Sequence, residues 1–279
     1  MSTPESEYGP LPAGVVRILA PNPSVMTGPG TNTFLVADEA AGAVVVIDPG
    51  PDIPDHLRRI ADEVGRRGAA RAILVTHGHP DHAEGAAALR DLLGVPVYAW
   101  SREGVPAMDT ALADDEIVLV GARRLRALYT PGHRFDHLCF LLEDSEALFA
   151  GDLIAGKGTV AIIPPEGDLV DYMASLERLR ALNPRLILPA HGPLLGDPGL
   201  VLDYYINHRM ERELQIVLAV ATGHQTVGEL VRVIYTDVNP DLHPVAAHSV
   251  LAHLYKLERE GWVRRSMGDE GEERWSLAT

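Results

Sequence analysis

The sequence predicts a layered α/β domain followed by a smaller, mostly helical unit. Short apolar segments rich in β-branched residues alternate with helical patterns through the first two thirds of the 279 residues. This alternation is typical of strands covered by helices. The composition changes at the turn-rich residues 196–199, and helical patterns dominate the remainder. We therefore predict one domain over residues 1–199 and a second over residues 200–279.

Short apolar segments bounded by Gly, Pro or Asp predict the strands of the first domain. They cover residues 14–19, 33–36, 43–47, 72–75, 97–99, 116–120, 148–150 and 186–188. The single cysteine, Cys139, lies in a further apolar run at residues 138–142. We expect it to be a buried thiol, and one cysteine forms no internal disulfide.

Apolar spacing and end signals predict the helices. In the first domain these are residues 54–67, 81–93 and 169–182, the last with Asp168 as its N-cap. In the second domain they are residues 200–221, 226–235 and 244–260, followed by candidate strands at 261–265 and 273–277. Three helices followed by a hairpin resemble a winged helix.

Composition limits the classes of function. Hydrophobic residues make up 46% of the chain, enough for a sizeable core, and the net charge is −15. Such acidity weighs against a broad nucleic-acid surface. No apolar run is long enough for a membrane helix, and residues 1–7 are acidic with no apolar core of a signal peptide. We therefore expect a cytoplasmic protein without a membrane partner.

The segment His77-Gly78-His79-Pro80-Asp81-His82 concentrates three imidazoles and a carboxylate directly after an apolar strand. Imidazole suits zinc and related ions, and carboxylates complete such sites. Further ligand candidates are His133, which comes just after an apolar-edged strand that ends near Tyr129, and Asp152 and His191, which follow the predicted strands 148–150 and 186–188. Side chains at strand ends meet at one edge of a sheet, so we expect a metal site there.

The order HxHxDH, Pro-Gly-His, Gly-Asp and His-Gly resembles the metallo-β-lactamase fold superfamily over about residues 14–195. The resemblance implies a four-layer αββα sandwich with two metal ions, zinc first and manganese or iron as alternatives. It assigns His77, His79 and His133 to one metal, Asp81, His82 and His191 to the other, and Asp152 to a bridging position. It further implies catalysis by a hydroxide shared between two zinc ions, which Asp81 helps to aim.

Three more residues are candidates for supporting roles. Asp48 matches the family's upstream aspartate, which orients metal ligands, and an ordinary turn residue is its alternative. His137 is either a proton donor or a histidine behind the ligands, and the second interpretation is favoured. Lys157 lies on a loop after Asp152 and is a candidate for contact with an anionic substrate, with a solvated lysine as the alternative.

The chain also resembles the lactamase-β 2-like branch, which carries a C-terminal winged-helix-like domain. The matching segments are Asn22-Pro23-Ser24, Gly30-Thr31-Asn32-Thr33, Asp136-His137, Asp171-Tyr172-Met173 and His208-Arg209. True β-lactamases lack this domain and generally have cysteine or serine at the position of Asp152. Antibiotic hydrolysis is therefore not expected.

The sequence leaves two substrate classes open. The branch is associated with single-strand endoribonuclease activity, while relatives elsewhere cleave esters, thioesters and lactones. Residues 221–279 contain 6 basic and 9 acidic residues, which is not the charge of a groove for nucleic acid. We therefore predict a small-molecule hydrolase, with cleavage of single-stranded RNA as a close alternative. The C-terminal unit is then expected to pack on the catalytic domain or to form a homodimer.

Other classes are disfavoured by particular residues. A mononuclear-iron persulfide dioxygenase would leave Asp81 and His82 uncoordinated. Di-iron oxygen reductases usually have glutamate at the position of His79. A transcription regulator would use the winged helix on duplex DNA, and the acidic charge disfavours that interaction.

Overall fold

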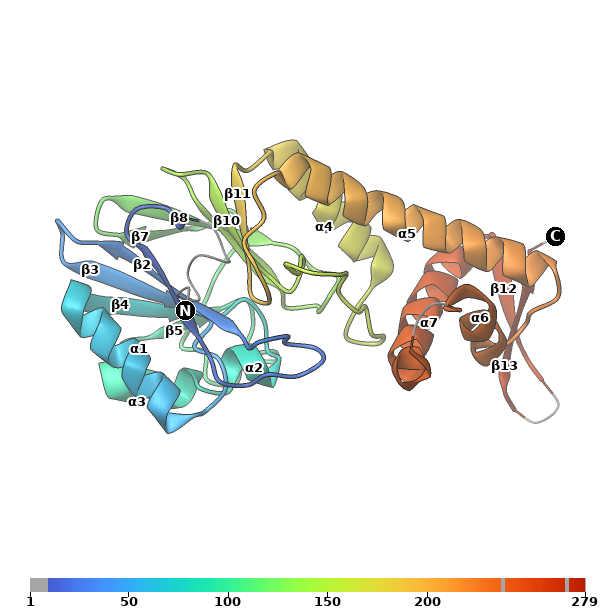
Figure 1. The fold of residues 1–279 in the computed structure, drawn as a ribbon, viewed down its shortest axis with the longest axis horizontal. Coiled ribbons are helices and arrows are strands. Elements are labelled where there is room, and N and C mark those ends of the chain that lie inside the picture. Colours follow the sequence, from blue (N-terminus) through green and yellow to red (C-terminus); the bar gives the residue numbers. More distant parts are fainter. Residues whose placement is uncertain (1–9, 237–238, 269–270, 279) are drawn as a thin grey trace, which may run out of the picture.

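The computed structural model describes residues 10–236, 239–268 and 271–278. Two β-sheets pack face to face with helices on the outer face of each, and a smaller helical unit follows (Figure 1). The predicted four-layer αββα sandwich with a C-terminal winged-helix-like domain is therefore confirmed. The acidic segment at residues 1–7 and the hairpin tip at 269–270 lie outside the described residues.

The first sheet has six strands. In spatial order they are β1 (Val15–Leu19), β2 (Asn32–Asp38), β3 (Ala43–Ile47), β4 (Ala69–Leu74), β5 (Val97–Ala99) and β6 (Thr110–Ala111). Strands β1 to β3 are antiparallel, and β3 to β6 are parallel. Helices α1 (Pro54–Arg67) and α3 (Ala86–Leu93) cover its outer face. All five residues of β3 are buried, as expected for a strand covered on both faces.

The second sheet has five strands. In spatial order they are β11 (Leu186–Pro189), β10 (Ala147–Gly151), β9 (Leu138–Leu142), β8 (Arg123–Tyr129) and β7 (Ile117–Val120). Only the pair β10 and β11 is parallel. Helix α4 (Leu169–Leu182) and the first half of α5 (Pro198–Ala221) cover the outer face. Asp168 caps α4 as predicted, since its side chain accepts hydrogen bonds from the Val170 and Asp171 amides.

The core between the sheets consists of aliphatic and aromatic side chains from both. Phe34 on β2 meets Phe149 on β10 edge to face, with ring centroids 5.2 Å apart. Burying such a ring stabilises the fold by about 1.5–3 kcal/mol. This dry core fixes the relative position of the two sheets, whose shared edge carries the candidate site.

One predicted helix is wrong in detail. The alanine-rich residues 81–93 form two helices, α2 (Pro80–Ala83) and α3, separated at Gly85. The amide of Gly85 donates to the Gly50 carbonyl at 2.9 Å, and a Cβ at Gly85 would lie 2.8 Å from the Leu57 side chain. This tertiary contact bends the chain, and the pattern of alanines does not reveal it.

The C-terminal unit contains helices and a two-stranded sheet. Its elements after α5 are α6 (Val227–Ile234), a short 3₁₀ turn (Pro240–Leu242), α7 (His243–Arg259), β12 (Val263–Met267) and β13 (Glu273–Leu277). Trp275 is fully buried in its core among Leu230 and Val250. None of the helices in the described ranges combines the length and apolar character needed to cross a membrane.

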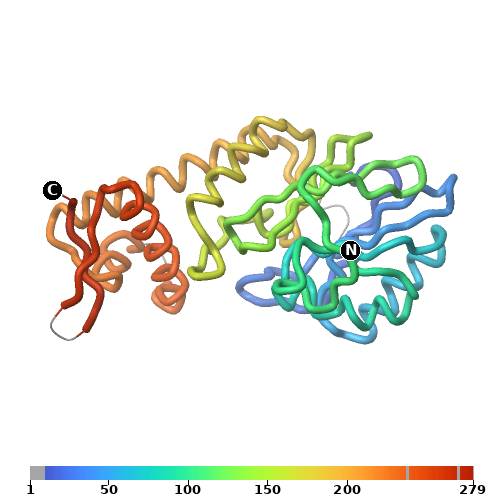
Figure 2. Tube along the Cα trace, turned by 180° about the vertical axis from the view of Figure 1, so that it is seen from behind, coloured from blue at the N-terminus to red at the C-terminus, as the bar shows by residue number. Residues whose placement is uncertain are grey.

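Helix α5 joins the two units as one continuous element (Figures 1 and 2). Leu202, Tyr205 and Ile206 in its first half pack in the core of the catalytic domain. Ile216 and Val220 in its second half pack in the core of the C-terminal unit. The predicted boundary after residue 199 thus falls at the start of a helix that belongs to both cores.

Candidate metal centre

Seven side chains gather where several strands end at one edge of the sandwich. His77, His79, Asp81 and His82 follow β4, His133 follows β8, Asp152 follows β10, and His191 follows β11. Their ligand atoms form two groups, each with all atoms within 4.8 Å of one another. The structure thus brings together all seven ligand candidates from the sequence.

The first group contains His77, His79, His133 and Asp152. His79 Nδ1 lies 2.9 Å from His77 Nε2 and 3.1 Å from His133 Nε2. Asp152 Oδ2 lies 3.7 Å from His133 Nε2. An ion bound tetrahedrally at about 2.0–2.1 Å places its ligand atoms about 3.3 Å apart, close to these separations.

The second group contains Asp81, His82 and His191. Asp81 Oδ2 lies 3.1 Å from His191 Nε2 and 3.5 Å from His82 Nε2. The other carboxylate oxygen of Asp152, Oδ1, lies 3.3 Å from His191 Nε2 and 3.5 Å from His82 Nε2. Asp152 therefore directs one oxygen towards each group, as a ligand shared by two ions must.

Hydrogen bonds behind the ligands orient their imidazole rings. His133 Nδ1 donates to the Ala161 carbonyl at 2.9 Å, and His82 Nδ1 donates to Asp48 Oδ2 at 2.8 Å. Since each Nδ1 carries a proton, Nε2 is the nitrogen that faces the site, and in the neutral ring it offers its lone pair there. His82 Nε2 is buried and has no hydrogen-bond partner, which is the environment expected for a nitrogen that binds an ion. The donor set therefore fits two borderline divalent cations.

Burial keeps the imidazoles of the first group neutral. It lowers the pKa of His77 well below the ordinary value, lowers that of His79 to about 4, and lowers that of His133. Neutral imidazole is the form that binds metals. The first group is thus ready for an ion at neutral pH without losing protons.

Charge has the opposite effect in the second group. Burial acts to lower the pKa of His191, but the Asp152 and Asp81 carboxylates raise it to about 9. The pKa of His82 is likewise raised well above its ordinary value, against burial, by Asp152, Asp48 and Asp81. In return, His82 and His191 hold the pKa of the Asp152 carboxyl well below its ordinary value, also against burial. A cation here would replace protons.

Asp48 and Thr76 link the two groups from behind. Asp48 accepts hydrogen bonds from the Thr76 amide at 2.7 Å and from the Thr76 hydroxyl at 2.8 Å, besides the bond from His82. The Thr76 hydroxyl then accepts from His77 Nδ1 at 3.1 Å. Asp48 is therefore placed to orient ligands. Thr76 did not emerge from the sequence, although its position between the strand and His77 was a signal.

The metal-binding loop has a tight backbone path. A Cβ at Gly78 would lie 2.0 Å from the Gly104 carbonyl oxygen, so only glycine fits there. The Gly78 amide donates to Asp136 Oδ2 at 3.0 Å, and Asp136 also accepts from Arg134. Sequence reasoning gave Asp136 no role at the site, and only its place in a family motif singled it out.

The structure places His137 behind the ligands and Lys157 at an exposed position of its loop. His137 is fully buried, its Nε2 accepts from the Asp152 amide at 3.1 Å, and its Nδ1 faces the Thr130 hydroxyl at 3.0 Å. It therefore supports the backbone of Asp152, which agrees with the favoured interpretation. Lys157 is exposed on its loop. Cys139 is buried, as expected, and burial raises the pKa of its thiol to about 12.

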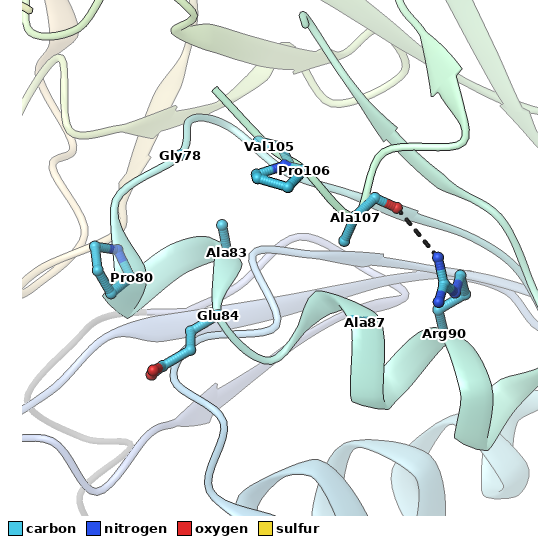
Figure 3. Close-up of a pocket in the computed structure, with 9 residues that line it drawn as sticks. All are labelled: Gly78, Pro80, Ala83, Glu84, Ala87, Arg90, Val105, Pro106 and Ala107. Atoms are coloured by element: carbon cyan, nitrogen blue, oxygen red, sulfur yellow. Dashed lines mark hydrogen bonds between the residues drawn. The ribbon is translucent and has the colours of Figure 1, made fainter. Parts of the chain in front are cut away.

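Two depressions flank the metal-binding loop. A groove of about 530 Å³ lies outside it, between α2–α3 and the segment 105–107 (Figure 3). It is lined by Gly78, Pro80, Ala83, Glu84, Ala87, Arg90, Val105, Pro106 and Ala107. A second pocket of about 320 Å³, the entrance pocket, opens on the first group and is lined by His79, His133, Ile163, Pro164, Pro165 and Glu166. The walls of the entrance pocket include two metal-ligand candidates, His79 and His133.

Comparisons with known proteins agree with this geometry. The family model described as the metallo-beta-lactamase superfamily matches residues 26–191, and the beta-lactamase associated winged helix domain matches residues 226–275. The chain is 34% identical over 284 residues to the "Beta-lactamase-like protein 2 homolog" of Drosophila melanogaster, covering 94% of each chain.

Solved structures show the same fold. A "Beta-lactamase domain protein" from Burkholderia ambifaria matches with a TM-score of 0.83 and 22% identity over 100% of this chain and 95% of that one. TTHA1623, described in a di-iron-bound form, matches with a TM-score of 0.53 and 26% identity over 66% of this chain and 96% of that one. By its motifs, its fold and these matches, the chain belongs to the metallo-beta-lactamase superfamily.

Proposed function

We propose that this chain is a dinuclear zinc hydrolase that cleaves an ester, thioester, lactone or related small acyl substrate. Its superfamily binds divalent metals and suggests a metal-dependent, hydrolase-type enzyme. The observation that carries the proposal is the pair of ligand groups that share Asp152, with one carboxylate oxygen facing each group.

Charge favours two cations over one. Asp48, Asp81 and Asp152 lie in or directly behind the site, and buried carboxylates need compensation. Two divalent cations would neutralise all three and leave one positive charge for an anionic group. A single cation in the first group would leave the second group, Asp81, His82 and His191, with no cation to bind. The complete second group is therefore the argument against the mononuclear-iron persulfide dioxygenase.

The bound cations and Asp81 would have different roles in the reaction. When bound, the two cations would polarise a substrate oxygen and lower the pKa of a water molecule to near 7. Asp81 remains ionised because His82 and His191 lower its pKa, against the effect of burial. Its Oδ2 faces His191, while Oδ1 has no hydrogen bond to another described residue. That free oxygen is suited to accept a proton from water and to aim it.

The surroundings support a small acyl substrate over RNA. The entrance pocket combines Ile163, Pro164 and Pro165 with the acidic Glu166, whose carboxylate pairs with Arg134 at 2.8 Å. This mixture suits a compact apolar group beside the ligands, whereas a polyanion requires basic residues. The C-terminal unit is acidic as well.

One experiment tests metal and reaction together. The protein is purified without added metal, its metal content is measured, and the chelated form is reloaded with zinc, manganese or iron. Each form is assayed on ester, thioester, lactone and phosphodiester substrates and on single-stranded RNA. We expect two ions per chain and acyl hydrolysis that zinc restores. A single tightly bound iron with no hydrolysis, or cleavage of RNA alone, would overturn the proposal.

A further inference from the structure

One segment connects three of the ligand-bearing loops. Residues 153–161 begin directly after Asp152. Midway, the Gly156 amide donates to the His191 carbonyl at 2.7 Å. At the end, the Ala161 carbonyl accepts from His133 Nδ1 at 2.9 Å. The path of this segment therefore sets the orientation of the His133 ring. We call it the ligand-tying segment.

Helices outside the site hold the ligand-tying segment from behind. Tyr172 on α4 donates to the Leu153 carbonyl at 2.8 Å. The Tyr205 hydroxyl on α5 accepts from the Ala155 amide at 2.9 Å and lies 3.0 Å from the Gly158 carbonyl. One turn further along α5, Arg209 donates to the Val160 carbonyl at 2.6 Å. That carbonyl is adjacent in sequence to the one that orients His133.

Arg209 is an unusual residue for a purely structural contact. It is 3% exposed, its guanidinium lies over the Tyr172 ring at 5.1 Å, and no described carboxylate forms an ion pair with it. Its Nε has no hydrogen-bond partner either. Burying a charge without a counter-ion costs stability, and an apolar side chain would pack there at lower cost. Its one strong hydrogen bond is directed at the ligand-tying segment.

We propose that Arg209, with Tyr205, is a positioning residue of the metal centre. It fixes the Val160–Ala161 backbone, which orients His133 and thereby the first ligand group. Because α5 also carries the C-terminal unit, the helix joining the two units takes part in building the metal site. This inference rests on the proposed metal-binding function but not on the identity of the substrate.

Arg212 provides a matched control. It lies on the same helix, over the Tyr235 ring at 4.1 Å, and donates to the Ile234 carbonyl at 3.3 Å. Arg209 and Arg212 thus make the same kinds of contact, but Arg212 makes its contacts within the C-terminal unit. Arg212→Met is expected to affect stability without affecting the metal centre.

The test measures zinc affinity by competition with a chromophoric chelator. Measurements are made in the full-length Asp81→Ala background, where the remaining tight ion reports the first group. We expect Arg209→Met to weaken this affinity about 10–100-fold, the usual scale for residues that orient ligands. Arg209→Lys should recover part of the loss, because its ammonium can still donate to the Val160 carbonyl. Tyr205→Phe, which removes one hydroxyl, should give a smaller loss and remains informative if Arg209→Met fails to fold.

The outcomes separate the two claims. If the Asp81→Ala protein binds no zinc at the first group, the proposed function fails. If it binds zinc and both Arg209→Met and Tyr205→Phe match it, only the positioning role is overturned. An equal loss in Arg212→Met would also overturn that role, since the effect would then be general destabilisation.

The outer face of α5 carries a second, independent feature. Six exposed positions repeat at spacings of four and three residues, as in the seam of a two-stranded coiled coil. They are Leu200, Tyr204, Asn207, Glu211, Leu214 and Leu218, and we call them the α5 stripe. The four apolar members are 72%, 55%, 59% and 57% exposed. Both views of the chain place α5 along an outer edge of the molecule (Figures 1 and 2).

The α5 stripe is complementary to a second copy of itself that runs in the opposite direction. In an antiparallel pair of α5 helices centred on residue 209, Leu200 faces Leu218 of a second copy and Tyr204 faces Leu214. Asn207 then faces Glu211, so its amide can donate to the carboxylate. A parallel pair would instead place Glu211 against Glu211, which is unfavourable. Self-complementarity of this kind defines a two-fold dimer interface.

We infer that the α5 stripe is the interface of an antiparallel homodimer. Analytical ultracentrifugation of the full chain should show a dimer that Leu214→Glu converts to a folded monomer. Leu119→Glu, at an equally exposed leucine on β7, should leave the dimer intact. Asn207→Asp should weaken the dimer by opposing two carboxylates, and adding Glu211→Gln should restore it. A monomeric wild type, or a dimer that Leu214→Glu leaves unchanged, would overturn the inference.

Discussion

The two ligand groups lie on either side of Asp152, yet their environments act in opposite directions. Burial dominates in the first group and lowers the pKa of each of its histidines, His77, His79 and His133. Carboxylates dominate in the second group and raise the pKa of His82 and His191. The first group thus presents neutral lone pairs, whereas the second holds protons that a cation must displace.

This difference shows that two ligand groups that share one carboxylate need not form two equivalent sites. Both groups supply histidine nitrogens at similar separations, but only the second has a carboxylate of its own, Asp81. We expect the first group to bind its ion with little proton release and the second with more. Four predictions test this comparison, starting with the residue that the groups share.

Asp152→Ala should have the largest effect because it removes a ligand from both groups. We expect loss of both ions and a fall in kcat/KM on the order of 10⁴-fold, the scale of deleting a central catalytic group. Metal content by elemental analysis and steady-state rates measure the two effects. Asp152→Asn is the control of matched shape, and it should retain the fold by circular dichroism. Two ions bound in Asp152→Ala would contradict a shared ligand.

Asp81→Ala should separate the groups. It removes the carboxylate of the second group only, so we expect one ion to remain and turnover to fall by about 10³-fold or more. The fold should be intact, because Asp81 is partly exposed and makes no buried structural contact besides the site. Glu84→Ala, a nearby exposed carboxylate, is the control for the loss of a negative charge. Rates like those of the wild type in Asp81→Ala would remove its role in aiming water.

The metal-free protein should show the opposed pKa shifts as two limbs of a stability profile. The folded pKa of His191 is about 9, against an ordinary value of 6.5. The contribution of His191 to the free energy of unfolding is therefore fully present below pH 6.5 and is lost as the pH rises through about 9. The folded pKa of His79 is about 4, so stability decreases as the pH falls from 6.5 towards 4.

Urea unfolding of the chelated protein across this range measures both limbs. His191→Gln should reduce the alkaline limb, to which His82 also contributes, and leave the acid limb unchanged. His79→Gln should reduce the acid limb, to which His77 and His133 also contribute, and leave the alkaline limb unchanged. Zinc should flatten the alkaline limb as well, because a bound cation replaces the protons of the second group. A profile in which either variant changes both limbs equally would show that the groups are not electrostatically distinct.

Much of this centre was predictable because strand-end motifs carry it. HxHxDH, His133, Asp152 and His191 each follow an apolar segment, and the structure places all seven ligands together. The bend at Gly85 was not predictable, since it depends on Gly50 and Leu57 from elsewhere in the chain. The Ala161 carbonyl was not predictable either, because a backbone acceptor has no signature in the sequence. The ligand residues could be predicted from local motifs, whereas the tertiary contacts that orient these ligands could not.

The choice between the two interpretations of His137 needed tertiary information as well. Its spacing from His133 allowed a side chain at the substrate or one behind the ligands. The hydrogen bond from the Asp152 amide gives it the second position, and that bond forms only once β9 and β10 pair. Sequence spacing within one loop does not specify which neighbouring loop a side chain will contact.

Thr76→Val should have the smallest effect and tests how strongly the two groups are coupled. It keeps the shape of the side chain but removes the hydroxyl between Asp48 and His77. The Thr76 amide still donates to Asp48, and Asp48 still orients His82. We therefore expect the first group to lose about 10-fold in zinc affinity and the second group to change less. Thr76→Ser, which retains the hydroxyl, should bind like the wild type. Equal losses at both groups would instead mean that Thr76 couples them through Asp48, and that one buried network sets the affinity of both.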